Sequence, residues 1–317
     1  MRLLTSSSFS PLLSAWLESG RHQNVCGRRV FVIDSRSEAS SLAPLVLLHG
    51  FPTSSFDYHL ILPSLAAKRR VVLFDLPGFG FSDKPERYSY SLFEQADVVE
   101  GLLARLNLDR PHLVAHDLGV NIACELLARQ QRKLHKLDFA SLTLMSAGIY
   151  DDLARLTTSQ KLLQTPVGTL LSNFAAGSLF KLQIQQVFAR AIDGAELDAM
   201  WEQQLYLDGY RRLPQIASYL AERTRFEERW LSALRTSEGV PVHVLWGSRD
   251  PTSRFAIAER LVEEIPGAEL TRLSKVGHYP QLEAPEETAY ALEQWLLKRE
   301  RIEGRDQGAE SRADVAE

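Results

Sequence analysis

The chain has 317 residues, 45% of them hydrophobic and 24% charged, a balance typical of globular proteins that excludes a wholly disordered chain. Its net charge of −4 indicates no general attraction to nucleic acid or to an anionic membrane. Two cysteines, Cys26 and Cys124, are too few for a disulfide scaffold or a structural zinc site, so we expect no metal and no other cofactor. No apolar run approaches the roughly 20 residues of a membrane span, and no secretory signal is evident, which predicts a cytoplasmic protein.

Residues 1–150 are predicted to form the first part of an α/β core, because short strand-like runs alternate with helical patterns. The expected strands cover residues 29–34, 44–49, 70–75, 111–116 and 141–146. Several of these runs are apolar throughout, as in parallel strands covered by helices on both faces. Helical patterns cover residues 92–106 and 119–131. This alternation predicts an α/β fold with a doubly wound, mostly parallel sheet.

The remainder of the chain divides into three further parts. Residues 151–235 have almost no strand signal, and we expect an inserted helical cap there. The α/β pattern resumes over residues 236–298, with strands at 240–246 and 269–273 and helices at 254–265 and 286–298. Residues 299–317 are charged and poor in apolar residues, which predicts a disordered tail.

A sharp strand-to-helix turn is expected at residues 113–119, Leu-Val-Ala-His-Asp-Leu-Gly. It is similar to the nucleophile elbow G-x-S-x-G, with Ala115 at the first glycine and Asp117 in place of the serine. A carboxylate, whose usual pKa is about 3.9, is ionised near neutral pH without help from a base. Its attack on an ester would give a reactive anhydride, whereas attack on a saturated electrophilic carbon gives an alkyl ester. Asp117 therefore predicts displacement at carbon and hydrolysis of the resulting enzyme ester; the alternative is a simple helix cap.

Two further residues follow predicted strands in the order that this architecture uses, nucleophile, acid and base. Asp250 comes just beyond one strand, and His278 just beyond the next. We expect Asp250 to orient His278, and His278 to activate the water that cleaves the ester. The segment His-Gly-Phe-Pro at 49–52 follows another strand, so the backbone N–H groups of Phe51 and Leu118 are the expected oxyanion donors.

These motifs together resemble the α/β-hydrolase superfamily, in its epoxide hydrolase and haloalkane dehalogenase branch. Segments 51–57, 78–85, 93–96 and 278–283 more narrowly resemble the mesoderm-specific transcript-like hydrolases. The resemblance extends over about residues 30–297 and is weaker in the cap. It implies an α/β-hydrolase fold and a catalytic triad of Asp117, His278 and Asp250.

The sequence departs from this branch at two positions that decide between chemistries. Haloalkane dehalogenases typically hold the departing halide between a Trp directly after the nucleophile and, often, an Asn between the Gly and the Pro. Leu118 and Phe51 occupy these positions here, and neither has a side-chain N–H donor. Dehalogenation is therefore disfavoured. Phe51 matches epoxide hydrolases, although Leu118 departs from them as well.

Opening of an epoxide requires an acid for the developing alkoxide, and in the resembled family cap tyrosines supply it. The candidates are Tyr219, Tyr210 and Tyr150, of which Tyr219 lies near the expected position of the family's second tyrosine. The alternative for each is an ordinary packing or surface residue.

We thus expect a cofactor-independent hydrolase with an aspartate nucleophile, acting on epoxides. One alternative keeps the triad and changes the substrate to a haloalkane or an activated ester. Another is a non-catalytic interaction protein of the same fold. The expected partners are a small apolar electrophile and water, with no nucleic acid, and the chain is expected to be a monomer or a homodimer.

Overall fold

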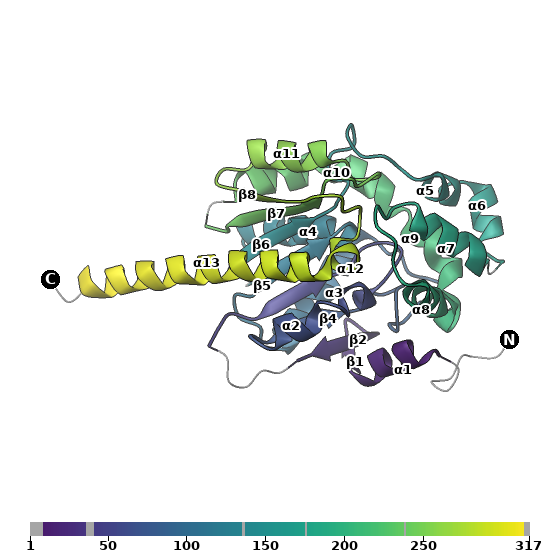
Figure 1. The fold of residues 1–317 in the computed structure, drawn as a ribbon, viewed down its shortest axis with the longest axis horizontal. Helices are drawn as coiled ribbons and strands as arrows, with labels where there is room; N and C mark the ends of the chain where they lie inside the picture. The colour runs from purple at the N-terminus through teal and green to yellow at the C-terminus, as the bar shows by residue number, and fades with distance from the viewer. Residues whose placement is uncertain (1–8, 36–40, 135–136, 175, 238, 314–317) are drawn as a thin grey trace.

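An eight-stranded sheet with the strand order β1-β2-β4-β3-β5-β6-β7-β8 forms the centre of the computed structural model (Figure 1). The structure describes the backbone of residues 9–35, 41–134, 137–174, 176–237 and 239–313, and side chains as far as Ile302. Strand β2 pairs antiparallel with β1 and β4, and the other neighbours run parallel. The predicted α/β class with a mostly parallel sheet is confirmed. The strands are β1 (Arg21–Val25), β2 (Arg28–Asp34), β3 (Leu45–Leu48), β4 (Val71–Phe74), β5 (His112–His116), β6 (Ser141–Met145), β7 (Val242–Gly247) and β8 (Glu269–Leu273).

Helices cover both faces of this sheet and fill the segment between β6 and β7. None of them, within the described parts of the chain, is both long and apolar enough to cross a membrane. The helices are α1 (Pro11–Glu18), α2 (Leu62–Ala66), α3 (Leu92–Arg105), α4 (Leu118–Gln131), α5 (Thr158–Leu163), α6 (Pro166–Leu171), α7 (Gly177–Gln185), α8 (Gly194–Leu205), α9 (Leu213–Ile216), α10 (Tyr219–Arg235), α11 (Phe255–Glu264), α12 (Pro280–Glu283) and α13 (Pro285–Ala313), with 3₁₀ helices η2 (Ser55–Tyr58) and η3 (Tyr206–Arg212).

Alternate side chains of the central strands enter two separate hydrophobic cores, which explains why these strands are apolar throughout. In β3, Val46 and Leu48 pack in a core with residues of α3, α4, α10 and α11. Leu45 and Leu47 of the same strand pack in a second core with residues of α1, α2 and α13. Because the strands between β4 and β8 are parallel, their carboxyl ends meet at one edge of the sheet, and loops that carry function commonly begin at this edge.

The first two elements, α1 and β1, were not predicted. Helix α1 begins at the N-cap Ser10 and buries Leu13 and Trp16 against the second core. Strand β1 joins β2 through Cys26 and Gly27, both with positive φ, as a two-residue hairpin turn requires. Only one residue of β1 is buried, so this edge strand lacks the apolar run by which the others were identified.

The prediction of a disordered tail from residue 299 is wrong as far as residue 313, because α13 continues to Ala313. Its charged residues are paired with the core rather than only solvated. Glu300 lies 2.5 Å from Arg69, whose side chain is only 3% exposed, and Arg299 pairs with Glu269 of β8. Residues 314–317 lie outside the described part of the chain.

Candidate active site

Asp117 occupies the tight turn between β5 and α4. Its φ of +46° is unusual for a residue with a side chain, and it directs the carboxylate away from the strand. Small neighbours make this turn possible. A Cβ atom on Gly119 would approach the carbonyl oxygens of Leu48 and His49 to within 2.9 Å and 2.8 Å, and one on Gly50 would lie 2.6 Å from Cβ of Asp117. The local geometry is thus that of the predicted elbow.

The two oxygens of the Asp117 carboxylate have different surroundings. Oδ2 accepts a hydrogen bond of 2.9 Å from the backbone N–H of Phe51, and the N–H of Leu118 also hydrogen-bonds this carboxylate. Oδ1 faces Nε2 of His278 at 3.8 Å. Both predicted donors thus contact the carboxylate, with Phe51 on Oδ2, while Oδ1 faces the imidazole.

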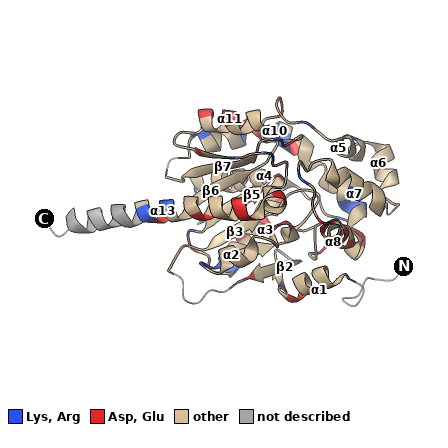
Figure 2. Ribbon diagram, in the orientation of Figure 1, with Lys and Arg blue, Asp and Glu red and all other residues tan. Residues whose placement is uncertain are grey.

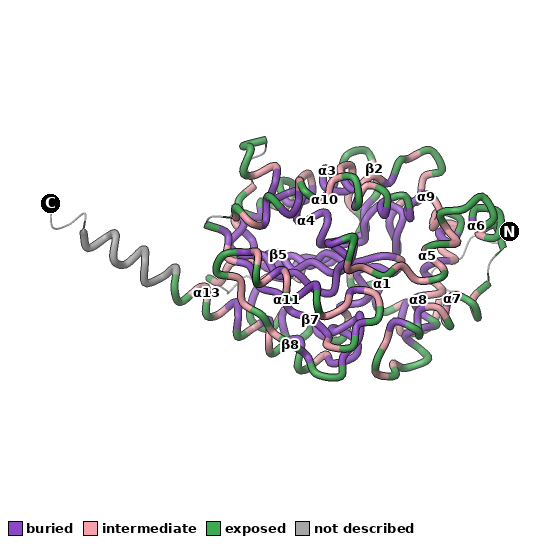
Figure 3. Tube along the Cα trace, turned by 90° about the horizontal axis from the view of Figure 1, so that it is seen from above, coloured by how far each residue is buried: buried purple, intermediate pink, exposed green. Residues whose placement is uncertain are grey.

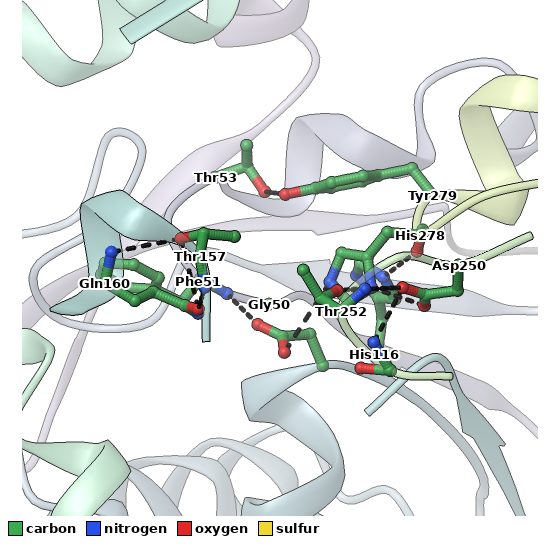
Figure 4. A network of polar contacts seen from close by, with 12 residues as sticks. Gly50, Phe51, Thr53, His116, Thr157, Gln160, Asp250, Thr252, His278 and Tyr279 are labelled. Atoms are coloured by element: carbon green, nitrogen blue, oxygen red, sulfur yellow. Dashed lines mark hydrogen bonds and ion pairs between the residues drawn. The ribbon is translucent and has the colours of Figure 1, made fainter. Parts of the chain in front are cut away.

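His278 and Asp250 are also together, as the order of the motifs predicts (Figure 4). Nδ1 of His278 lies 2.8 Å from Oδ2 of Asp250. The other oxygen of Asp250 accepts hydrogen bonds from the backbone N–H groups of Thr252 and Ser253, at 2.9 Å and 2.8 Å, and from the Thr252 hydroxyl. These donors fix the carboxylate, and the carboxylate in turn directs Nε2 of His278 toward Asp117.

Burial and mutual charge set the protonation of this group. Burial raises the pKa of Asp117, opposed by His278, the N–H donors of Phe51 and Leu118, and the charge of Arg223. For His278, burial lowers the pKa, but the charge and hydrogen bond of Asp250 and the charge of Asp117 outweigh it and raise the pKa to about 9. Near neutral pH, His278 is therefore an imidazolium ion between two carboxylates.

His116, which directly precedes the elbow residue, ties the two halves of this group together. Its Nε2 atom lies 2.8 Å from the carbonyl oxygen of His278 and is the donor, because the carbonyl can only accept. Burial, with the charge of His278, holds the pKa of His116 well below its usual value, so its ring is neutral. The sequence motif contains this residue, but nothing in it predicted the contact with His278.

A cavity containing about 730 Å³ of empty space, part of it open to solvent, lies in front of Asp117. The core contributes Phe51, His278 and Tyr279 to its walls, and the helical segment between β6 and β7 contributes mainly apolar side chains. Those apolar residues include Leu156, Leu163, Ile184, Val187 and Leu213. Polar side chains, among them Thr157, Gln160 and Arg223, complete the lining, so the cavity is apolar with a few polar groups, as in small-molecule sites.

Of the three candidate tyrosines, only Tyr219 lines this cavity. It is 2% exposed, and its ring lies 5.6 Å from that of Phe51. Burial, followed by the charge of Asp117, raises its pKa well above the usual value, so the hydroxyl keeps its proton at neutral pH. Arg223, one helical turn further along α10, also lines the cavity and pairs with Asp151 at 3.0 Å.

The positions of Tyr150 and Tyr210 argue against the expected role of either as an acid. The hydroxyl of Tyr150 donates to Glu264 at 2.9 Å, and the guanidinium of Arg260 lies over its ring. Tyr210 packs near Trp201 and lines a neighbouring groove rather than the cavity at Asp117. In place of these two, the structure brings Tyr279 into the cavity wall, which the sequence did not predict.

Comparison with known proteins identifies the family of the chain. A model of the α/β hydrolase fold family matches residues 43–285. The chain belongs to this family. It is 37% identical over 287 residues to the mesoderm-specific transcript homolog protein of Bos taurus, covering 87% of this chain and 85% of that protein. It is 35% identical over 284 residues to a Mycobacterium tuberculosis protein named as a hydrolase, LipZ, covering 89% and 96%.

Solved structures of low sequence identity share the fold. A haloalkane dehalogenase, DbeA from Bradyrhizobium elkani, is 24% identical, with a TM-score of 0.74 and coverage of 90% of this chain and 99% of that one. The predicted resemblance to this branch of the α/β hydrolases is thus confirmed. Among the described residues, no group of three or more His, Cys, Asp or Glu side chains is placed to hold a metal ion.

Proposed function

We propose that this α/β hydrolase uses Asp117 as a nucleophile, forms an alkyl ester on it, and hydrolyses that ester with water activated by His278. The main support is the unequal environment of the Asp117 oxygens. Oδ2 accepts a hydrogen bond from the backbone N–H of Phe51, while Oδ1 lies 3.8 Å from Nε2 of His278, and Asp117 lines the cavity. A serine hydrolase would instead need a hydroxyl in hydrogen-bond contact with the imidazole.

The first step forms the ester. Oδ1 of Asp117 attacks a carbon of an epoxide, the carbon–oxygen bond of the ring breaks, and the ring oxygen keeps the electron pair. The hydroxyl of Tyr219, in the wall of the same cavity, donates a proton to this oxygen. The products of this step are a hydroxyalkyl ester of Asp117 and a tyrosinate.

The second step releases the product. Formation of the ester removes the charge of Asp117 and so lowers the pKa of His278, which releases its proton to solvent. Nε2 of the neutral imidazole then removes a proton from water, and the hydroxide attacks Cγ of Asp117, placing negative charge on Oδ2. The N–H groups of Phe51 and Leu118 stabilise that charge. The ester bond then breaks, the leaving alkoxide takes the proton from His278, and the proton of the new carboxylic acid returns to the tyrosinate. The sum is epoxide plus water giving a diol.

The hydrogen-bond donors around Asp117 favour epoxides over other electrophiles as substrates. A departing halide would find no side-chain N–H at Leu118 or Phe51, whereas an alkoxide finds the hydroxyl of Tyr219. Attack by Asp117 on a carboxylic ester would give an anhydride. The ordered triad and the cavity also argue against a non-catalytic interaction protein.

Two variants and one control test the proposal. Asp117→Ala is expected to abolish turnover, and His278→Gln to accumulate an adduct that intact mass places on Asp117. Asp138→Ala removes a carboxylate that is 53% exposed and outside the cavity, so it keeps full activity. Full-rate hydrolysis of styrene oxide by both active-site variants would end the proposal. Brisk bromide release from short bromoalkanes, with no diol formed from epoxides, would replace it by dehalogenation.

A further inference from the structure

One face of the helical segment is unusually apolar. Six large hydrophobic residues lie exposed within residues 167–182, while the other exposed ones among the described residues are scattered. Val167 and Leu170 of α6 are 58% and 63% exposed, and Leu179 and Leu182 of α7 are 51% and 55% exposed. Each pair is spaced i, i+3 and so lies on one side of its helix. We call these four residues, together with Leu171 and Phe174, the α6–α7 face. The trace of α6 is mostly exposed in Figure 3.

The chain segment that carries the α6–α7 face contains only basic charges, two of which are paired with acidic residues of other segments: Lys181 with Asp198 and Arg190 with Glu287. Residues 153–192 contain no Asp or Glu, but contain Arg155, Lys161, Lys181 and Arg190. Lys161 on α5 is exposed beside this face. In Figure 2, helices α5 and α6 accordingly have no red segment, in contrast to α8 and α13. Of the other two cations, Arg155 lines the cavity at Asp117, which leaves Lys161 as the exposed cation on α5.

The α6–α7 face also connects with the catalytic cavity. Leu171, Phe174 and Leu179 line an apolar groove of about 630 Å³. Five residues, Ser159, Leu163, Phe180, Gln183 and Leu213, line both this groove and the cavity at Asp117. The groove therefore lies next to the cavity that contains Asp117.

We propose that the α6–α7 face docks reversibly on an anionic lipid surface, and that a lipophilic substrate passes from that surface along the groove to Asp117. The delivery part rests on the proposed function; the docking does not. Interfacial membrane-binding elements typically combine exposed Leu and Phe side chains with nearby cations. Residues 153–192 show this pattern and contain no acidic residue. A second protein molecule on this face would cover the outer wall of the groove, whereas a lipid surface both covers the apolar side chains and supplies the groove's occupant.

The test uses the full chain with vesicles of phosphatidylcholine and of equal amounts of phosphatidylcholine and phosphatidylglycerol, in a flotation assay. We expect stronger binding to the anionic vesicles. Val167→Ser with Leu170→Ser should weaken that binding by at least about tenfold, because two apolar side chains leave the interface. Leu134→Ser is the matched control. Leu134 is 64% exposed but follows the C-terminal end of α4 and is not part of the α6–α7 face, so its substitution should not change binding.

Two further measurements separate the alternatives. Lys161→Glu should weaken binding to the anionic vesicles by several-fold and leave binding to phosphatidylcholine unchanged. Absence of vesicle binding, or equal losses for Leu134→Ser and the Val167/Leu170 variant, would overturn the docking. So would a dimer in sedimentation velocity that the Val167/Leu170 variant dissociates, combined with no binding to vesicles.

The delivery step has its own readout. Turnover of a long-chain epoxide embedded in the anionic vesicles should fall in the Val167/Leu170 variant in proportion to lost binding, while turnover of water-soluble styrene oxide stays at the wild-type rate. An equal rate on embedded epoxide for this variant and the wild type would overturn delivery through the α6–α7 face. Vesicle binding without turnover of either epoxide would count against the proposed reaction and still support docking.

Discussion

Nε2 of His278 lies 3.8 Å from Oδ1 of Asp117, close enough for strong attraction between opposite charges but too far for a good hydrogen bond. The separation leaves Oδ1 available to an incoming carbon. It also means that the pKa of each group depends on the charge of the other. A reaction that changes the charge of Asp117 therefore changes the pKa of His278.

The first prediction concerns pH. Formation of the ester neutralises Asp117, and this removes one of the charges that raise the pKa of His278 to about 9. In the ester intermediate, the pKa of His278 is therefore below that value. Hydrolysis of the ester becomes faster as the pH rises through this lowered pKa, because more of His278 is then neutral. Rapid quench and intact mass near pH 6.5 and near pH 9 should show more ester at the lower pH. Equal amounts at both would show that His278 is not the base.

The second prediction concerns the acid. Tyr219→Phe removes the hydroxyl of the one candidate tyrosine, of Tyr150, Tyr210 and Tyr219, that lines the cavity, and should slow epoxide opening by about 100-fold, because the alkoxide then leaves unprotonated. Single-turnover kinetics should assign the loss to ester formation, with hydrolysis of the ester less affected. Tyr150→Phe is the control, since its hydroxyl bonds Glu264 outside the cavity, and should keep the wild-type rate. Equal losses in both variants would contradict the assignment.

Local patterns predicted the sheet and the elbow well, because apolar strands and a crowded turn impose strong constraints on neighbouring residues. Asp250 and His278 could be paired with Asp117 from their order after strands, since parallel strands bring their carboxyl ends to one edge. Their roles remain predictions. The distances of 2.8 Å from Nδ1 of His278 to Asp250 and of 3.8 Å from its Nε2 to Asp117 are compatible with those roles.

The cap tyrosines could not be ranked in the same way. Between β6 and β7 several helices are packed against one another, and the side chains that face the cavity depend on this packing rather than on any motif. Tyr210 and Tyr219 are nine positions apart, yet they line different hollows. His116 was missed for a similar reason: its partner is the backbone carbonyl of His278, which no residue pattern reveals.

The third prediction concerns the end of α13. Glu300 lies 2.5 Å from the buried Arg69 and also near His112. Glu300→Gln should lower the free energy of unfolding by about 2 kcal/mol, because Arg69 keeps its charge and loses its counter-ion. Urea denaturation measures the loss. Glu293→Gln is the control, because the partner of Glu293, Lys68, is half exposed. It should lower the free energy of unfolding by less than about 1 kcal/mol. An equal loss in both variants would mean that the burial of Arg69 does not matter.

The fourth prediction concerns Glu125, a buried carboxylate that joins α4 to α10. It accepts hydrogen bonds from Arg129, from Arg229 at 2.7 Å and from the indole of Trp230 at 3.1 Å. Glu125→Gln should lower the free energy of unfolding by about 3 kcal/mol, because two guanidinium groups lose their shared counter-charge. Glu228→Gln on α10 is the control, since Glu228 is 79% exposed, and should change stability by less than about 0.5 kcal/mol.

The same carboxylate gives the effect a definite pH dependence. Burial raises the pKa of Glu125, but hydrogen bonds from Arg229, Trp230 and Arg129 outweigh it, so the folded-state pKa lies below the usual 4.5. A lowered folded-state pKa adds stability above the unfolded value, and that stability is lost as the pH falls through the folded one. The wild type should therefore be more stable than Glu125→Gln at neutral pH, and the difference should shrink in acid. A difference in melting temperature that stays constant below pH 4.5 would show that Glu125 acts through shape rather than charge.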